Sequence, residues 1–425
     1  MRRLAYADEI PMKRILAWGD SPTAGTGFGN VNYYVLKALV TTGRYQVDQL
    51  GINDPGSFHN PTEVPWQVIP ARLRDPRDLA GRRAFLEQVR HGSYDYLWIL
   101  NDPYIVAPIT DELGKIKQEF IKTHKKAPKI IFYYTVDCQL RHNQGSLLLR
   151  ADQVATTSEF GKLATLKSFP ELADSVKVIP IGIDPTAFKR IPNEARAAIR
   201  RTHFNAPDDS TFIFINVNRN SSRKQLPLTI LAFAEFRKRH PNCRLYLHTQ
   251  TSGIGGSLDL RLAAADLGLS PQEVIFPLHN SPTQTVPVDT LNKCYNAADA
   301  FITTSLGEGW GLTHLEAMAT GLPVVCPDNS VFPEQLNGGR SGYLYPCREQ
   351  IWVENSGYRP LPRVDDILAA MEAVYQDLLT CRQAGGSAAE LPRVKAAQEY
   401  LTTLQWKEIL PRWITLFDEL GGAGA

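Results

Sequence analysis

Short apolar runs alternate with stretches of helical periodicity along this chain. The apolar runs predict strands at residues 13–18, 46–51, 94–100, 129–134, 153–157, 211–217, 244–248, 274–276, 300–303 and 324–326. Apolar positions spaced three and four residues apart predict helices at residues 30–41, 79–90, 111–124, 228–239, 258–267, 288–297 and 364–379. This alternation is typical of α/β proteins with helices on both faces of a doubly wound parallel sheet.

The alternating pattern falls into two stretches joined by a segment that contains proline and glycine. Pro180, Gly182 and Pro185 predict a kinked connection between domains. With 425 residues, the chain is long enough for two domains that each bury a core. We therefore expect a first domain over residues 1–185 and a second over residues 190–400.

Three segments lie outside this alternation. Residues 1–12 are expected to form a loose extension, and residues 348–365 an irregular insertion. The last helical pattern, over about residues 403–420, carries a stripe of large apolar side chains that predicts packing, and Pro411 inside it predicts a kink or an interruption. The stripe consists of Trp406, Ile409, Leu410, Trp413, Ile414 and Phe417.

Composition adds little beyond a globular character. Apolar residues make up 43% and charged residues 21% of the chain, and the net charge of +2 gives no overall nucleic-acid signature. The six cysteines have no metal-binding spacing, which predicts reduced thiols. We find no signal-peptide pattern and no apolar run near the ~20 residues of a membrane span, so we expect a cytoplasmic protein.

Residues 299–327 are the most informative stretch. A predicted strand leads through three glycines between 307 and 311 into a helix that ends near Gly321, and a second strand follows. The first turn of such a helix has free backbone N–H groups and a favourable dipole for an anion. Glu308 lies on the turn and Glu316 about one turn into the helix. This spacing suits contacts with a ligand, although it equally fits an ordinary helix-face glutamate.

The complete amino-acid sequence of this stretch favours a ligand-binding role for the two glutamates. Glu308-Gly-Trp-Gly-Leu-Thr-His-Leu-Glu316, followed by Ala-Met-Ala-Thr-Gly-Leu-Pro-Val-Val, closely resembles the signature of the retaining glycosyltransferases of family 4. Residues 158–188 resemble the end of the first domain in that family. Ser158 there is also expected to be the N-cap of the next helix.

This resemblance implies the GT-B fold, in which two Rossmann-like doubly wound domains face a central cleft. It implies that the first domain lies on the acceptor side and that the second binds a nucleotide-sugar donor. It also implies that the terminal helix packs back on the first domain. The expected reaction is the transfer of a hexose to an acceptor hydroxyl with retention of the anomeric configuration.

The resemblance also implies the donor-binding residues. Glu308 would grip hydroxyls of the donor sugar with the backbone at Trp310 and Gly311, and Glu316 would bind the ribose. The remaining positions are the helix start at Leu312 and Thr313, the nucleobase loop at Leu278 and His279, and the first-domain glycines Gly27 and Gly29. His279 also fits an incidental position. The first-domain glycines do not form a dinucleotide fingerprint, because the third glycine is missing.

Cationic residues follow the first strand of the expected second domain. The family places an arginine and a lysine about five residues apart here, on the donor diphosphate, and Arg219 and Lys224 match that spacing. Arginine offers a planar fork for phosphate oxygens and lysine a point charge. Arg223 competes for either role, and all three residues also fit an ordinary charged surface.

One departure from the family concerns the first domain. Many members place a histidine after the fourth strand, near the donor sugar, and residues 133–138 contain none. Asp137 is the expected occupant, with a purely structural role as its alternative. No Asp-x-Asp motif is present to hold a metal ion, so we expect a metal-independent reaction without a cofactor, using a UDP- or GDP-sugar such as UDP-glucose.

Three functions remain open from the sequence. The first is a retaining glycosyltransferase whose acceptor is a small molecule, a glycan or a lipid. The second is the same chemistry on a modified nucleic-acid base, as in phage DNA glucosyltransferases. The third is an inactive sugar-nucleotide-binding protein. A helix with a basic face, Lys115 to Lys126, is expected to be a surface helix packed by Ile116, Phe120 and Ile121; contact with a phosphate-bearing acceptor is its alternative.

Overall fold

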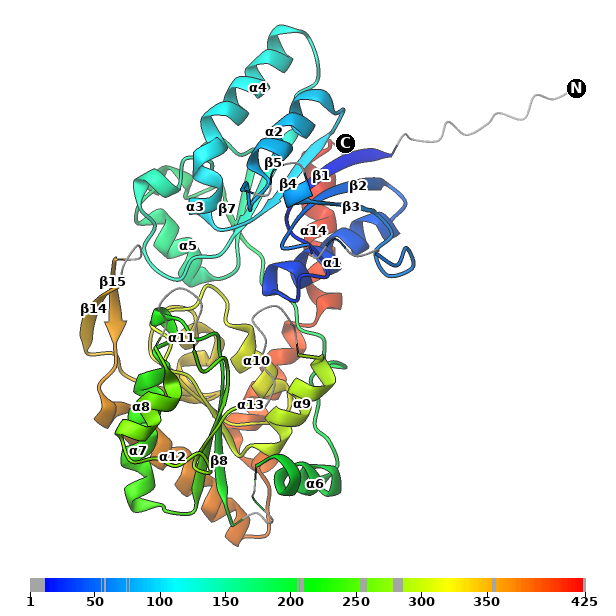
Figure 1. Ribbon diagram of the computed structural model, residues 1–425. Helices are drawn as coiled ribbons and strands as arrows, with labels where there is room; N and C mark the ends of the chain where they lie inside the picture. Colours follow the sequence, from blue (N-terminus) through cyan, green and yellow to red (C-terminus); the bar gives the residue numbers. More distant parts are fainter. Residues whose placement is uncertain are drawn as a thin grey trace, which may run out of the picture. The chain divides into compact units, whose positions relative to one another are not determined.

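The protein divides into two compact units. The computed structural model describes residues 12–422 except 55, 57, 58, 74, 76, 205, 207–209, 253–257, 278–285 and 354–356. The first unit comprises Met1–Thr157, Lys162–Gly182 and Trp406–Ala425, and the second comprises Ser158–Gly161 and Ile183–Gln405. Figure 1 labels the elements of both units.

The first unit is built on a seven-stranded parallel sheet with strand order β3-β2-β1-β4-β5-β6-β7. The chain winds outward from β1 in both directions, which confirms the doubly wound prediction. The pattern of apolar runs did not predict the short strands β3 and β7. The strands are β1 (Lys13–Asp20), β2 (Tyr45–Ile52), β3 (Gln67–Pro70), β4 (Tyr96–Leu100), β5 (Lys129–Tyr134), β6 (Gln153–Thr156) and β7 (Val176–Val178).

Six helices accompany this part of the chain. They are α1 (Gly27–Thr41), α2 (Arg82–His91), α3 (Pro103–Val106), α4 (Thr110–Lys122), α5 (Glu159–Leu166) and, from the C-terminal region, α14 (Trp406–Leu420). Helix α1 begins three residues before the predicted start, because the Thr26 hydroxyl caps it by accepting a hydrogen bond from Gly29 N at 3.0 Å. The Ser158 hydroxyl caps α5 in the same way, through Gly161 N at 2.9 Å.

Helix α14 belongs to the first unit although it is last in the chain. Its Trp413 is 1% exposed and packs against Trp98 and Tyr133, with ring centroids 4.8 and 4.7 Å away. The helix runs unbroken through Pro411, so the predicted interruption is wrong. Burial of the aromatic stripe stabilises the helix despite the hydrogen bond that proline cannot donate.

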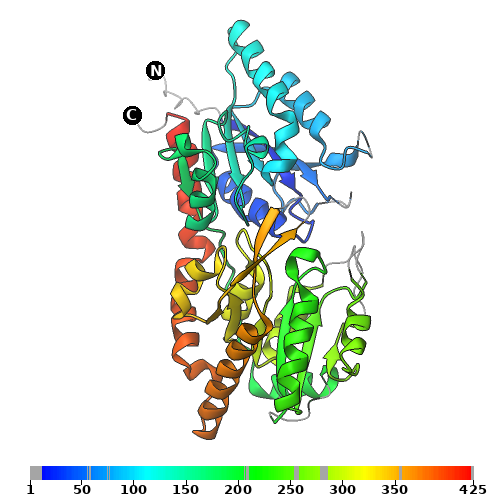
Figure 2. The same ribbon diagram turned by 90° about the vertical axis from the view of Figure 1, so that its left-hand side faces the viewer.

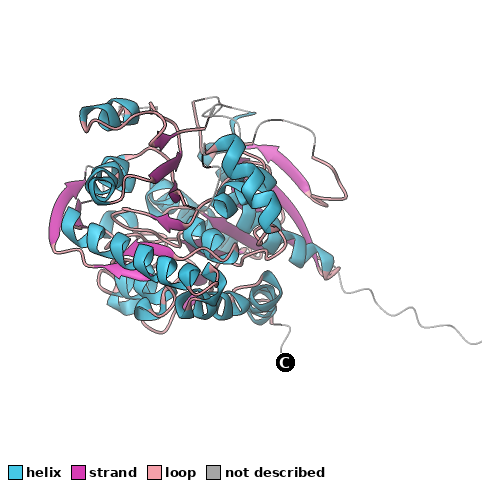
Figure 3. Cartoon of the chain, turned by 90° about the horizontal axis from the view of Figure 1, so that it is seen from below, coloured by secondary structure: helices cyan, strands magenta, loops and turns pink. Residues whose placement is uncertain are grey.

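The second unit contains a six-stranded parallel sheet with strand order β10-β9-β8-β11-β12-β13. The order again reverses at the first strand of the unit, so both sheets are doubly wound. Figure 3 shows the helices on either side of the strands. The strands are β8 (Phe212–Val217), β9 (Cys243–His248), β10 (Val274–Ile275), β11 (Ala300–Ile302), β12 (Val324–Pro327) and β13 (Tyr343–Tyr345).

The helices of this unit agree with the periodic segments, apart from α6, α11 and α13, which the pattern did not predict. They are α6 (Asn193–His203), α7 (Leu226–Arg239), α8 (Leu260–Asp266), α9 (Val288–Ala297), α10 (Leu312–Ala319), α11 (Phe332–Gln335), α12 (Val364–Gln383) and α13 (Pro392–Thr403). Helices α7 and α12 contribute Phe233, Phe236, Met371 and Val374 to one buried core with β8 and β9.

The expected irregular insertion at 348–365 is instead an antiparallel hairpin of β14 (Glu349–Val353) and β15 (Gly357–Leu361). Figure 2 shows its two strands side by side. Trp352 pairs with Tyr358, and both rings are exposed. The sequence did not predict the second strand because it contains Pro360, and proline within sheets is found mainly on edge strands.

Candidate functional site

Two loops meet at the carboxyl edge of the second unit's sheet. Because β8 and β11 are parallel neighbours, the segments that follow them lie side by side. The amide of Leu306 donates to the carbonyl of Arg223 at 2.9 Å, and the Thr304 hydroxyl donates to the carbonyl of Gln225 at 2.8 Å. These bonds hold the side chains of Arg223 and Lys224 next to the turn that carries Glu308.

Glu308 is the centre of a buried charge cluster. Glu308 is 8% exposed, and its two carboxylate oxygens bind different cationic side chains. Arg223 Nη1 lies 3.1 Å from Oε2, and Lys224 Nζ donates to Oε1. The Glu308 amide donates to the Ser330 hydroxyl at 2.9 Å, which fixes the backbone of the turn.

The cluster keeps Glu308 ionised. Burial alone would raise the pKa of this carboxyl group, but the attraction of Lys224 and Arg223 outweighs it, together with hydrogen bonds from Lys224 and Ser305. The net effect of burial, charge and hydrogen bonding is to lower the pKa of Glu308 from 4.5 to about 2. The site therefore presents a fixed carboxylate and two neighbouring cations at neutral pH.

The glycine turn leads directly into helix α10. Gly311 is the N-cap residue with φ +74°, and a Cβ there would lie 2.6 Å from the His314 ring. Glycine is therefore required by conformation and by space. Leu312 and Thr313 form the half-buried first turn, whose backbone N–H groups have no helical partner. Trp310 is 4% exposed, and its Nε1 is buried without a hydrogen-bond partner among the described residues.

Glu316 lies farther along α10 and is half-buried. The hydroxyl of Tyr295, on α9, donates to its Oε2 at 2.8 Å. Burial raises the pKa of Glu316 to about 7, and the hydrogen bond from Tyr295 acts in the opposite direction. The two glutamates of the turn and helix thus differ in charge behaviour: Glu308 stays ionised, while Glu316 titrates near neutral pH.

Other residues singled out from the sequence lie differently. Arg219 is exposed and makes no hydrogen bond or ion pair with a described residue, whereas its rival Arg223 contacts Glu308. Leu278 and His279 lie outside the described residues. Sequence reasoning missed Tyr295, because nothing in its local pattern marks a contact that spans 21 positions.

The first-unit residues follow the carboxyl ends of β1 and β5. Gly27 opens α1, and Gly29 packs so closely that a Cβ would lie 2.5 Å from the carbonyl oxygen of Ser21. Asp137 is half-buried after β5.

The charge of the basic helix α4 is partly neutralised. Lys117 pairs with Asp152 at 2.7 Å, and Lys115 with Glu112 at 3.5 Å. Phe120 and Ile116 are buried as predicted, but Ile121 is 55% exposed, so its expected packing role is wrong. These pairs reduce the charge available for a phosphate backbone.

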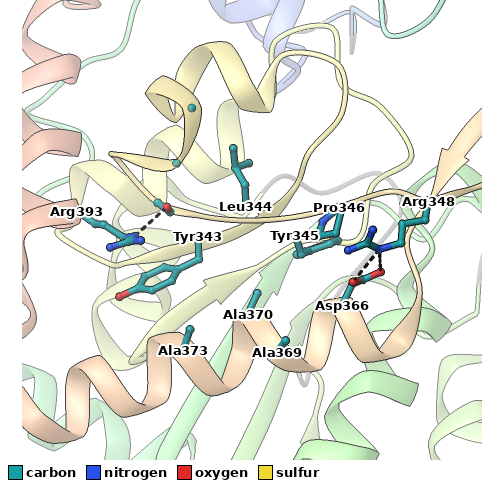
Figure 4. Close-up of a pocket in the computed structure, with 13 residues that line it drawn as sticks. Tyr343, Leu344, Tyr345, Pro346, Arg348, Asp366, Ala369, Ala370, Ala373 and Arg393 are labelled. Atoms are coloured by element: carbon teal, nitrogen blue, oxygen red, sulfur yellow. Dashed lines mark hydrogen bonds and ion pairs between the residues drawn. The ribbon is translucent and has the colours of Figure 1, made fainter.

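A cavity of about 470 Å³ lies elsewhere in the second unit, between β13 and α12. Figure 4 shows its alanine-lined floor, the pair of Arg348 with Asp366, and Arg393 donating to the Gly342 carbonyl. Glu308, Arg223, Lys224 and Glu316 are not among the residues that line it, so it is separate from the Glu308 cluster.

Among the described residues, no group of three or more histidine, cysteine or acidic side chains is arranged to hold a metal ion. None of the described helices combines the length and apolar character needed to cross a bilayer.

Comparison with known proteins identifies the second unit. Residues 199–352, which include the Glu308 cluster and Glu316, match the family "Glycosyl transferases group 1". This part of the second unit is similar to that family. The group 1 match thus includes residues 308–325, whose sequence resembles the family 4 signature.

Curated relatives match over a similar part of the chain. A D-inositol 3-phosphate glycosyltransferase of Corynebacterium jeikeium is 32% identical over 46% of this chain and 46% of its own length. One from Acidothermus cellulolyticus is 28% identical over 47% and 44%. An alpha-monoglucosyldiacylglycerol synthase of Streptococcus pneumoniae is 30% identical over 40% and 36%. The chain spans less than half the length of these relatives.

Solved structures match nearly the whole chain and show that the fold is GT-B. A glycosyltransferase from Rickettsia africae has a TM-score of 0.68 at 14% identity, covering 97% of this chain and 99% of that one. A sucrose-phosphate synthase from Thermosynechococcus elongatus scores 0.67 at 19%, covering 97% and 100%. HepE of Anabaena, in complex with UDP-glucose, scores 0.63 at 15%, covering 96% and 99%.

Proposed function

We propose that this protein is a retaining glycosyltransferase that moves a hexose from a nucleotide-diphosphate sugar to an acceptor hydroxyl. The observation that carries the proposal is the buried Glu308, held by Lys224 and Arg223 beside the start of α10. The group 1 match over the same residues supports it, as does the similarity to HepE, which was solved in complex with UDP-glucose.

Sugar transfer needs negative charge stabilised on the departing diphosphate. Lys224, Arg223 and the free N–H groups at the start of α10 supply fixed positive charge there. We propose that Glu308 and the backbone at Trp310 and Gly311 hold the donor sugar, and that Glu316 accepts hydrogen bonds from the ribose. Because the positive groups are already in place, we propose that the reaction needs no metal ion.

The first unit supplies the acceptor side in this proposal. Gly27 and the closely packed Gly29 would face the donor phosphates, and Asp137 would occupy the position of the family's histidine. The proposal leaves a small molecule, a glycan or a lipid as the acceptor class. A nucleic-acid acceptor has less support, since carboxylates pair with Lys115 and Lys117 of the basic helix.

The decisive experiment measures hydrolysis of UDP-glucose and of other UDP- and GDP-sugars without an added acceptor. We expect Glu308→Gln and Glu316→Gln to reduce turnover at least ~100-fold, the scale of losing one key polar contact. Glu235→Gln, in an exposed pair with Lys238, is the matched control and should keep full activity.

The released or transferred sugar should be the α-anomer when an α-linked donor is used, as NMR of the product will show. If no nucleotide sugar is bound or cleaved, the protein is not an active glycosyltransferase. DNA binding that weakens steeply with salt would instead favour the nucleic-acid acceptor.

A further inference from the structure

Tyr295 is held rigidly inside the second unit. Its side chain is fully buried on α9, and its ring packs against Phe188 at a centroid distance of 5.9 Å and Phe301 at 6.4 Å. These aromatic contacts leave the ring little freedom, so the position of its hydroxyl is set by the core.

That hydroxyl meets one oxygen of Glu316. The phenol donates to Oε2 at 2.8 Å, whereas no described residue donates to Oε1. A carboxylate accepts several hydrogen bonds, and only one of its oxygens is engaged here. The contact therefore fixes the plane of the carboxylate while leaving acceptor capacity for a ligand.

We propose that Tyr295 is a positioning residue of the nucleotide site, which orients Glu316 so that its free oxygen accepts the ribose hydroxyls. The proposal rests on the proposed function, because it takes a nucleoside diphosphate as the ligand of Glu316. It adds a residue that does not itself touch the nucleotide and acts only through the glutamate.

The contact also controls ionisation. A phenol that donates to a carboxylate favours the ionised form, so losing it raises the pKa of Glu316 further above about 7. Among the described residues, no charged group adds to the effects of burial and of the Tyr295 hydrogen bond on the pKa of Glu316. Gln398 of α13 is neutral and bonds the Met318 carbonyl, and burial raises the pKa of Cys326 on β12. His314, on α10 itself, bonds Gln335 and stays neutral because burial lowers its pKa to about 4.

The test is calorimetric binding of UDP, with GDP in parallel, between pH 6 and pH 9 to the wild type and Tyr295→Phe. One hydrogen bond to a charged group corresponds to about one pKa unit. Tyr295→Phe should therefore bind UDP about tenfold more weakly than wild type at pH 6, about fivefold at pH 7, and within about twofold at pH 9. The ratio of the two affinities cancels the titration of the nucleotide's own phosphate, whose pKa is ~6.

Two controls separate positioning from damage to the fold. Tyr343→Phe removes a chemically matched contact, since the Tyr343 hydroxyl donates to Asp377 at 2.6 Å outside this site, and should leave the UDP profile unchanged. A UDP analogue without the 2′- and 3′-hydroxyls should bind wild type and Tyr295→Phe equally at every pH. In a Glu316→Gln background, Tyr295→Phe should change UDP affinity less than twofold.

A uniform loss of UDP affinity at all pH values would overturn the proposal, because it indicates structural damage. An unchanged profile would overturn it as well. If the wild type binds neither UDP nor GDP, the proposed function itself fails, and this result is distinguishable because it does not depend on the variant.

Discussion

Replacing Glu308 by glutamine removes the carboxylate that neutralises Lys224 and Arg223 but leaves the shape of the side chain. The folded-state pKa of about 2, against 4.5 for the free side chain, measures how strongly the fold favours the ionised form. A shift of about 2.5 units at 1.36 kcal/mol each corresponds to about 3 kcal/mol. This agrees with the ~3–5 kcal/mol cost of breaking a buried ion pair.

The sign of the pH dependence follows from the lowered pKa. The contribution of Glu308 is fully present above pH 4.5, and it is lost as the pH falls toward 2. Glu308→Gln should therefore melt about 6–12 °C below wild type at neutral pH. The gap should stay constant from pH 7 to pH 5 and narrow only below pH 4.5.

Thermal melting of both proteins across this range is the assay, with donor hydrolysis measured in parallel. The double variant Lys224→Met/Glu308→Gln removes both charges and should recover at least half of the lost stability without recovering activity. The exposed-pair variant Glu235→Gln should change stability by less than ~0.5 kcal/mol. A destabilisation below ~1 kcal/mol for Glu308→Gln, or a gap that narrows above pH 5, would refute this account of the cluster.

Three further predictions concern the turn, the returning helix and metal ions. Gly311→Ala places a Cβ against His314 and should lower donor hydrolysis at least ~10-fold, whereas Gly43→Ala, with a similar φ of +71° and no atom within 4 Å, should not. Trp413→Ala removes the ring that packs against Trp98 and should lower the free energy of unfolding, measured with denaturant, by ~3–5 kcal/mol. A decrease under ~1 kcal/mol would mean that α14 does not stabilise the first unit. Donor hydrolysis should survive EDTA, and a loss that magnesium restores would contradict the metal-independent site.

Local pattern was sufficient for most of the architecture. Continuous apolar runs indicate strands that are buried on both faces of a parallel sheet, and apolar positions about 3.6 residues apart indicate helices. The pattern failed where local signals conflict with packing. Pro411 predicts a break in the last helix, yet the buried Trp413 and Phe417 keep α14 continuous. Pro360 argued against a strand at 357–361, yet β15 forms there and pairs with β14.

The sequence by itself determined two doubly wound sheets, because the alternation of strand and helix patterns depends on neighbours close in the chain. Its resemblance to the family 4 signature pointed to Glu308 and Glu316 as candidate site residues. Only the tertiary structure decided which cation meets Glu308. All three residues Arg219, Arg223 and Lys224 are cations after β8, and spacing favoured Arg219 and Lys224. The hydrogen bond from Leu306 to the Arg223 carbonyl places Arg223 and Lys224 at the carboxylate, whereas Arg219 is exposed. Tyr295 likewise reaches Glu316 only because the fold brings a side chain of α9 within 2.8 Å of one on α10, and a contact between separate helices leaves no periodic trace in either one.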